Sequence, residues 1–214
     1  MKKEQLIAAL EIGQAHFAEI LRFSHTDETI RLTIRTFPSN TDLHHVTIKA
    51  IIINTLYGTV IYDVPRISRH IAGLFVDQKL AIADLSLIDD IRKGHGIGTD
   101  SKERNLYSFA TKYVHFHKPD AYPLYDNLVK ELLPAINNAV DFSQRFTQKS
   151  LLTYQTYKNI IDSLMDFMNV SNWGYKRFDE GLWVIARYKK EKKHDKIRMP
   201  PGVFTYLKQT IGDI

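Results

Sequence analysis

The spacing of apolar residues constrains the fold of this chain more than any other feature of its sequence. Between residues 154 and 168 the apolar side chains recur every three or four positions, at Tyr154, Tyr157, Ile160, Ile161, Leu164, Met165 and Met168. This spacing places them on one face of an α-helix. A helix with one apolar face must bury that face against other elements, and the same period recurs along most of the chain. The sequence therefore predicts an all-α protein.

Further helices are predicted on both sides of this segment. They cover approximately residues 6–21, 42–57, 65–75, 85–91, 101–115, 126–140 and 175–190, with a last helix after residue 202. Residues 29–37 alternate apolar and polar side chains, which fits either a strand or a helix rich in β-branched residues. No internal repeat or low-complexity linker interrupts the chain, so we expect about ten helices in a single domain over residues 1–214.

The absence of cysteine and of long apolar runs excludes several classes of protein. The 214 residues contain no cysteine, which excludes a disulfide framework, a cysteine nucleophile and a thiolate metal site. No run of about 18 apolar residues is present, so no membrane-spanning helix is expected. The first residues are not followed by the apolar core of a secretory signal. We therefore expect a cytoplasmic protein that has no membrane partner.

Positive charge is concentrated in one short segment. The chain has 29 Lys and Arg residues against 24 Asp and Glu, a net charge of +5. Residues 187–198 alone hold seven bases and two acids, so the rest of the chain balances at 22 against 22. A basic strip on a neutral body suits a partner that carries phosphate, and Lys189, Lys190, Lys192 and Lys193 are the predicted phosphate contacts. A solvated, lysine-rich helix end is the alternative.

A glycine-rich turn separates two predicted helices. Its sequence is Gly94-His95-Gly96-Ile97-Gly98-Thr99. Glycines let backbone N–H groups approach an anion, and the start of the following helix adds partial positive charge. Gly96, Gly98 and Thr99 are therefore candidate phosphate contacts. A helix C-cap followed by an ordinary turn would give the same pattern.

Two prolines lead into another predicted helix. The segment from Lys118 to Val129 contains Pro119 and Pro123, which favour an extended connection, and it brings Asp126 to the helix start. Asp at that position is a preferred N-cap. A carboxylate held there is also fixed and ionised, as a catalytic base or a group that stabilises a cation must be.

Polar residues close the apolar helix at residues 42–57. Asn54 and Tyr57 stand at its end, where they can cap the helix or line a pocket. His115 and His117 are the obvious residues for a metal site, but side chains two positions apart on a helix point in different directions. No metal site is predicted.

The order and spacing of these motifs resemble the helix–hairpin–helix DNA glycosylases, most closely their 8-oxoguanine-type branch. The resemblance covers roughly residues 45–130 and rests on Gly96-Ile97-Gly98-Thr99, the helix after it, and the pattern Lys118-Pro119-x-Ala121-x-Pro123-x-x-Asp126. It implies a bundle of helices with a cleft between two helical lobes. Within that bundle, residues 85–130 would hold the helix–hairpin–helix motif and the catalytic segment.

The same resemblance implies a role for each matching residue. Asp126 would be the catalytic aspartate, which stabilises positive charge at the sugar. Gly96 and Gly98 would hold a DNA phosphate. Asn54 and Tyr57 would line the pocket that receives a flipped base.

The position of the catalytic lysine departs from the family pattern. Bifunctional members carry a lysine almost directly after the hairpin, where this chain has Asp100. Lys102 is the first alternative amine, since the start of a helix favours a neutral amine, and Lys112 is the second. We therefore expect a monofunctional enzyme that leaves an intact abasic site.

The sequence as a whole predicts a monomeric DNA-binding glycosylase, cytoplasmic and associated with the nucleoid, that hydrolyses the N-glycosidic bond of a flipped base and needs no cofactor. Two other interpretations fit the same features. One is a helix–hairpin–helix protein that binds DNA without catalysis. The other is a helical protein–protein interaction domain whose basic strip aids solubility. A steep loss of affinity with salt would separate this last class from both DNA-binding classes.

Overall fold

The computed structural model describes residues 2–21, 25–93 and 106–212, and the regular elements in these ranges are all helices. The helices are α1 (Lys3–Leu21), α2 (Thr26–Thr36), α3 (Leu43–Tyr57), α4 (Val64–Ala72), α5 (Val76–Ala81), α6 (Ser86–Arg92), α7 (Tyr107–His117), α8 (Asn127–Val140), α9 (Tyr154–Met168), α10 (Gly174–Lys193) and α11 (Pro201–Ile211), with short 3-10 turns at Ser150–Leu152 and Ser171–Trp173. The predicted all-α class is confirmed for the described ranges, which contain eleven α-helices and no strand. The ambiguous segment at residues 29–37 is helical up to Thr36, within α2.

The chain divides into two compact units. Residues 25–124 form the first, which we call the central unit. Residues 1–24 and 125–214 form the second, which we call the terminal unit because both ends of the chain contribute to it.

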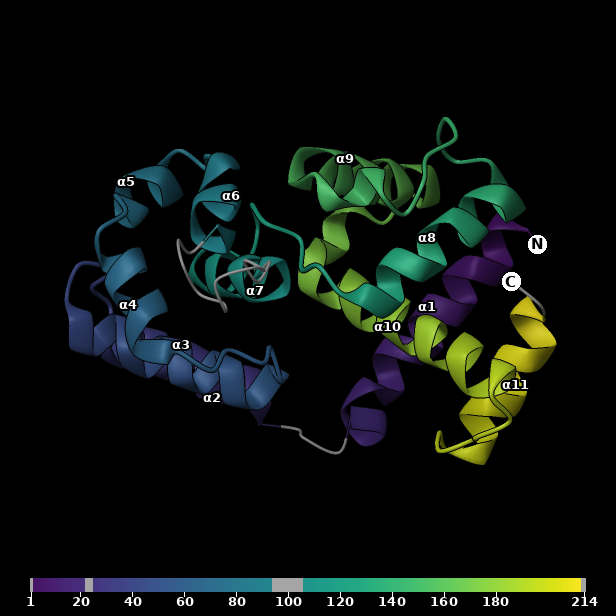
Figure 1. The fold of residues 1–214 in the computed structure, drawn as a ribbon. Coiled ribbons are helices and arrows are strands. Elements are labelled where there is room, and N and C mark those ends of the chain that lie inside the picture. Colours follow the sequence, from purple (N-terminus) through teal and green to yellow (C-terminus); the bar gives the residue numbers. More distant parts are fainter. Residues whose placement is uncertain (1, 22–24, 94–105, 213–214) are drawn as a thin grey trace. The chain divides into compact units, whose positions relative to one another are not determined.

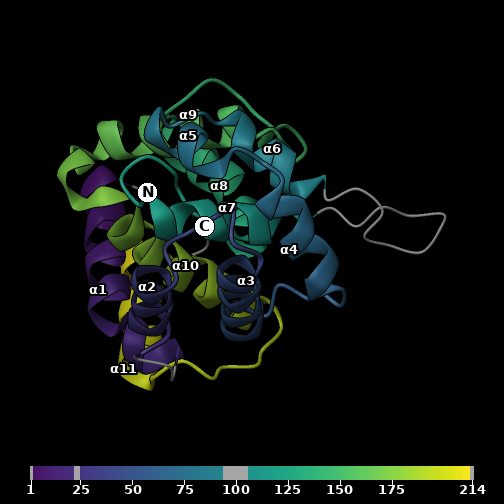
Figure 2. The ribbon, with the colours of Figure 1, turned by 90° about the vertical axis from the view of Figure 1, so that its left-hand side faces the viewer.

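The central unit is organised around α3 and α7. Helix α3 packs against α2, α4 and α7, and α6 packs against α7; Figure 2 shows α2 and α3 next to each other. Asp42 starts α3, because its carboxylate accepts hydrogen bonds from the N–H groups of His44 and His45. Gly58 ends α3 in the left-handed conformation, with φ of 58°. Helix α7 is buried continuously from Phe109 to Phe116 and forms the core of this unit.

The terminal unit is built on close contact between α1 and α10. Helix α10 also packs against α8 and α11, and α1 packs against α11 (Figure 1). Gly181 of α10 allows the close approach, because a Cβ atom there would lie only 2.8 Å from the backbone oxygen of Leu10. On α9, all seven residues of the predicted apolar stripe are buried, as expected. The packing of α1 and α8 on α10 fixes the position of the basic carboxyl end of α10.

Candidate functional site

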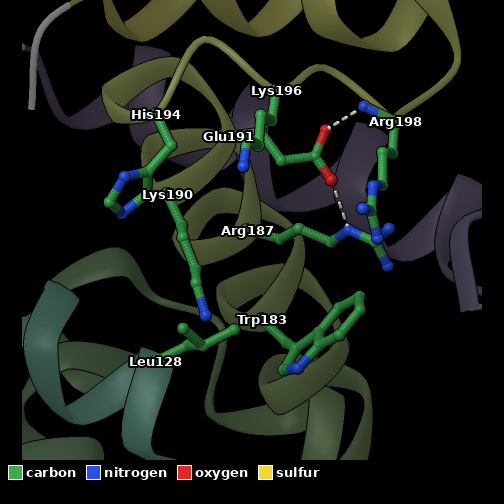
Figure 3. Close-up of a pocket in the computed structure, with 8 residues that line it drawn as sticks. All are labelled: Leu128, Trp183, Arg187, Lys190, Glu191, His194, Lys196 and Arg198. Atoms are coloured by element: carbon green, nitrogen blue, oxygen red, sulfur yellow. Dashed lines mark hydrogen bonds and ion pairs between the residues drawn. The ribbon is translucent and has the colours of Figure 1, made fainter.

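The basic strip divides between two pockets of the terminal unit. The first, which we call the Lys190 pocket, has a volume of about 460 Å³ and is lined by Leu128, Trp183, Arg187, Lys190, Glu191, His194, Lys196 and Arg198 (Figure 3). The second, which we call the Lys192 pocket, has a volume of about 330 Å³ and is lined by Ile185, Tyr188, Lys189, Lys192, Lys193, Ile211 and Gly212. The four lysines predicted to contact phosphate therefore do not share one surface.

Helical geometry explains this division. Residues 187, 190, 191 and 194 are spaced by three or four positions and lie on one face at the end of α10. Residues 189, 192 and 193 have the same spacing on another face. Trp183 lies one turn before Arg187 on the first face. This helical spacing can be read from the sequence, but the number of charges in the strip does not show which lysines share a face.

Glu191 organises the Lys190 pocket. It is buried, and its carboxylate accepts hydrogen bonds from Arg187 Nε at 2.7 Å, from the N–H of Arg198 at 2.7 Å and from the N–H of Met199 at 2.9 Å. Burial alone would raise the pKa of the Glu191 carboxyl, but these hydrogen bonds and the charge of Arg187 outweigh burial and lower it. Glu191 thus ties the loop after α10 to the helix and neutralises one of the cations.

Three cations of the Lys190 pocket have no carboxylate partner among the described residues. Figure 3 shows Lys190 extending toward Leu128 of α8, while Arg198 lies on the same side as Arg187. No ion pair of Lys190, Lys196 or Arg198 occurs among the described residues, and all three are exposed. With Arg187 paired to Glu191, these side chains give the pocket an excess of about three positive charges at neutral pH. The pocket therefore attracts anions.

The Lys192 pocket uses part of its charge within the fold. Lys192 Nζ donates to the backbone oxygen of Gly212 at 3.1 Å, and the Tyr188 hydroxyl donates to the same oxygen at 3.0 Å. Burial, and then the charge of Lys193, lowers the pKa of Lys189. Lys192 thus helps to hold the end of α11 against α10.

Asp126 lies at the start of α8, as the sequence predicted. It has an extended backbone, and its carboxylate accepts the N–H of Leu128 at 2.7 Å. The side chain is half-buried, and this is its one hydrogen bond within the described ranges. Burial, followed by the charges of Asp126 and Glu131, raises the pKa of the neighbouring Tyr125 to about 12. Leu128, whose N–H the Asp126 carboxylate accepts, lines the Lys190 pocket, whereas Asp126 itself does not.

Asn54 and Tyr57 lie in the central unit. The Asn54 side chain donates to the backbone oxygen of Ile61 at 3.0 Å and accepts from the N–H of Ile61 and the hydroxyl of Thr59, both at 2.9 Å. Its amide therefore closes the loop after α3. The Tyr57 hydroxyl donates to Asp27 Oδ1 at 2.7 Å. The role of Asn54 and Tyr57 in a base pocket stays a prediction.

Of the two candidate lysines, Lys112 lies within the described residues and Lys102 does not. Lys112 is buried on α7 in the central unit, where its Nζ donates to Ser108 Oγ at 2.8 Å and lies 5.2 Å from the centre of the Tyr57 ring. Lys102 lies outside the described residues, as do Gly96, Gly98, Thr99 and Asp100. The roles given to these residues therefore stay predictions.

Sequence reasoning missed a buried polar cluster in the central unit. Lys49 of α3 is fully buried, and its Nζ donates to the Ser39 backbone oxygen at 3.0 Å, to Asn40 Oδ1 at 2.7 Å and to His117 Nε2 at 3.2 Å. The Tyr113 hydroxyl also donates to Asn40 Oδ1, at 2.6 Å. We call these five residues the Lys49 cluster. The one feature of the sequence that could have indicated this cluster is a lysine within an otherwise apolar helix.

Burial controls the ionisation of the Lys49 cluster. It lowers the pKa of Lys49 to about 8, although the charge of Asp77 acts in the opposite direction. Burial, and then the charge of Lys49, lowers the pKa of His117 to about 4. His117 donates from Nδ1 to the Tyr113 backbone oxygen at 2.7 Å, so its Nε2 is left to accept from Lys49. Neutral His117 is thus the form that fits this cluster.

In the ranges that the structure describes, no three or more His, Asp or Glu side chains come together as a metal site would require. None of the helices in those ranges combines the length and the apolar character needed to span a bilayer.

Comparison with known proteins places this helical chain in a family. The HI_0787_N family, described as an N-terminal domain, matches residues 8–121, which is more than half of the chain, and the chain belongs to that family. The match includes the Lys49 cluster and ends before Asp126 and the basic strip. The family description states no activity.

A relative from Haemophilus influenzae extends this comparison. It bears the name "Uncharacterized protein", and it is 32% identical over 135 residues, which make up 63% of this chain and 62% of the relative. The chain therefore spans less than two thirds of the length of the curated relative it matches. No solved structure gives a significant match.

Proposed function

We propose that this protein binds DNA and excises a base from it, with Asp126 as the catalytic carboxylate. The observation that carries the proposal is the position of Asp126: it starts α8, is half-buried, and accepts the N–H of Leu128, which lines a pocket whose three cations have no carboxylate partner among the described residues. In this proposal the protein is a monomer that acts on nucleoid DNA and needs no cofactor. It rests on this arrangement and on the resemblance of residues 45–130 to helix–hairpin–helix glycosylases.

The proposed reaction is the hydrolysis of an N-glycosidic bond. The bond between C1′ of the sugar and the base nitrogen breaks, water supplies a hydroxyl to C1′, and its remaining proton goes to the departing base. Positive charge develops on the sugar as that bond breaks, and an ionised carboxylate nearby stabilises it. The base has to leave the helical stack first, because its glycosidic bond is not accessible within a duplex.

A comparison with other capping aspartates supports the choice of Asp126. Asp42 and Asp63 also cap helices, α3 and α4, but both are exposed. The carboxylate of Asp42 accepts two backbone N–H groups, whereas that of Asp126 accepts one. A partly desolvated carboxylate that retains acceptor capacity is better suited to stabilise a developing cation.

Base excision is tested directly with modified DNA. The protein is incubated with oligonucleotides that carry damaged or modified bases, and alkali then cleaves any abasic sites. Asp126→Asn should keep the fold and DNA affinity, since an amide still caps a helix, but lower excision on the order of a hundredfold or more. Asp63→Asn is the matched control, and it should leave excision unchanged.

The other outcomes separate the remaining interpretations. Salt-sensitive DNA binding with no abasic product on any substrate would favour a DNA-binding protein without catalysis. If DNA binding did not weaken as salt rises, a helical interaction domain would be the better interpretation. Normal turnover by Asp126→Asn would reduce Asp126 to a helix cap.

A further inference from the structure

We infer that the Lys190 pocket is a binding site for a terminal phosphate, the phosphomonoester of a nucleotide or of a nucleic-acid end. This inference goes beyond base excision, because it requires no chemistry at Asp126 and no glycosidic bond. It concerns a concave site in the terminal unit, whereas a strip of lysines would contact backbone phosphates along an open surface.

The charge of the pocket fits a dianion. Lys190, Lys196 and Arg198 have no carboxylate partner in the described part of the chain, while Glu191 is held by Arg187 and by two backbone N–H groups. A phosphomonoester carries about −1.5 to −2 charges near pH 7, whereas a backbone phosphodiester carries a single negative charge. Three cations that line one pocket therefore favour the terminal phosphate over the diester.

The pocket is also held in place before a ligand binds. The bonds from the N–H groups of Arg198 and Met199 to Glu191 fix the loop that carries Lys196 and Arg198. Arg187 donates from a second nitrogen to the Ile20 backbone oxygen at 3.3 Å, which ties this wall of the pocket to α1. Preorganised cations lose less conformational entropy when an anion binds.

The apolar walls suit the group that bears the phosphate. Trp183 and Leu128 line the pocket beside the cations (Figure 3). Trp183 is fixed by an edge-to-face contact with Phe17, with ring centres 5.6 Å apart, and by the guanidinium of Arg187 at 5.3 Å from its ring. A volume of about 460 Å³ lies within the range of small-molecule sites. A nucleoside can therefore contact Trp183 and Leu128 while its phosphate faces the cations.

The fluorescence of Trp183 can be used to measure ligand binding in this pocket. The chain has two tryptophans, Trp173 and Trp183, so Trp173→Phe leaves a protein whose tryptophan fluorescence reports on this pocket. This protein is titrated with a nucleoside 5′-monophosphate, the matching nucleoside and inorganic phosphate. It is then titrated with one single-stranded oligonucleotide in its 5′-phosphorylated and 5′-hydroxyl forms. We expect saturable fluorescence changes that depend on the terminal phosphate.

Paired variants locate the site. In the Trp173→Phe protein, Lys190→Gln with Lys196→Gln should weaken phosphate-dependent binding by about tenfold or more, because the variant lacks two charge-assisted hydrogen bonds to the phosphate. Lys149→Gln with Lys208→Gln removes the same charge from two exposed positions of the terminal unit that line neither pocket, and it should change affinity by less than about threefold. Circular dichroism and thermal melting confirm that both variants fold.

The titrations and the paired variants distinguish a nucleic-acid end from a free nucleotide and can overturn the inference. Tighter binding of the 5′-phosphorylated oligonucleotide than of the mononucleotide supports a nucleic-acid end as ligand, and the reverse order supports a free nucleotide. Equal binding with and without the terminal phosphate, or an equal decrease in affinity in the two variants, would overturn the inference. Base excision that persists in the pocket variant would leave the proposed function intact, so the two proposals fail separately.

Discussion

Two lysines of the central unit and two lysines of the terminal unit lie in opposite environments. In the central unit, Lys49 donates to three acceptors, and Lys118 donates to the backbone oxygens of Leu80 and Ala81 at 2.7 and 2.8 Å. In the terminal unit, Lys190 and Lys196 line a pocket without a carboxylate partner among the described residues. The comparison shows that the local environment of a lysine, and not its place in a charge count, indicates whether it supports the fold or can bind a ligand.

The largest expected effect is on the free energy of unfolding, and it tests the contrast between these lysines. Lys49→Ala removes the donor to His117 Nε2 and one of the two donors to Asn40 Oδ1, and it creates a cavity, so we expect the free energy of unfolding to fall by about 3–5 kcal/mol. Lys190→Ala should change it by less than about 0.5 kcal/mol. Urea denaturation of both variants measures the difference. An equal decrease in the two variants would remove the distinction between the two units.

A second test uses pH. The pKa of His117 is about 4 in the folded protein and about 6.5 in an unfolded chain, so between these values the unfolded chain binds the additional proton. The stabilisation is therefore complete above about pH 6.5 and declines as pH falls toward 4, by up to about 3 kcal/mol. Urea titrations across this window should show a flatter profile for His117→Gln.

An exposed histidine provides the control for this pH test. His44 lies on α3 with 95% of its side chain exposed, so His44→Gln should leave the profile unchanged. A His117→Gln profile as steep as that of the wild type would show that His117 titrates normally in the folded protein.

A smaller effect is expected on DNA affinity from the basic strip. Replacing Lys189, Lys190, Lys192 and Lys193 by Gln should weaken binding uniformly across sequences and flatten the salt dependence by roughly one unit for each lysine–phosphate interaction that is removed. Lys192→Gln alone should have the smallest effect, because this lysine already donates to Gly212. Filter binding at several salt concentrations measures the slope, and an unchanged slope would show that the strip does not contact phosphate.

The smallest expected effect concerns covalent trapping by lysine. Lys112 is buried and donates to Ser108, so an attack on C1′ by this amine is not expected, and borohydride should trap no protein–DNA adduct on substrate DNA. An adduct that disappears in Lys102→Gln would show that the enzyme has lyase activity. One that disappears only in Lys112→Gln would assign the amine to the central unit.

Local patterns in the sequence predicted much of the fold. The apolar period located α9 at Tyr154–Met168, and a proline-rich connection followed by Asp located the start of α8. Both depend on interactions within a few residues. Residues 29–37 were ambiguous because their alternation fits two structures. The helix buries Ile30 and leaves Leu32 55% exposed, a distribution that alternation alone does not predict.

The Lys49 cluster and part of the Lys190 pocket were not predicted because they depend on contacts between residues far apart in the sequence. Lys49 meets His117 across 68 positions, and Tyr113 meets Asn40 across 73, so no local pattern brings these side chains together. The Lys190 pocket was predictable in part, since Trp183, Arg187 and Lys190 follow a helical spacing. Its wall from Leu128 depends on the packing of α8 against α10.

The contact between α1 and α10 has a consequence for the order of folding during synthesis. Roughly 150 residues separate Leu21 from Gly174, and at about 5–20 residues per second the ribosome needs on the order of 10–30 seconds to make them. The central unit is completed within that interval, while Leu6, Ala9 and Leu10, all fully buried in the finished protein, have no α10 to cover them. The nascent chain therefore carries an exposed apolar helix until the segment with Gly181 emerges, and during that time chaperones can bind it.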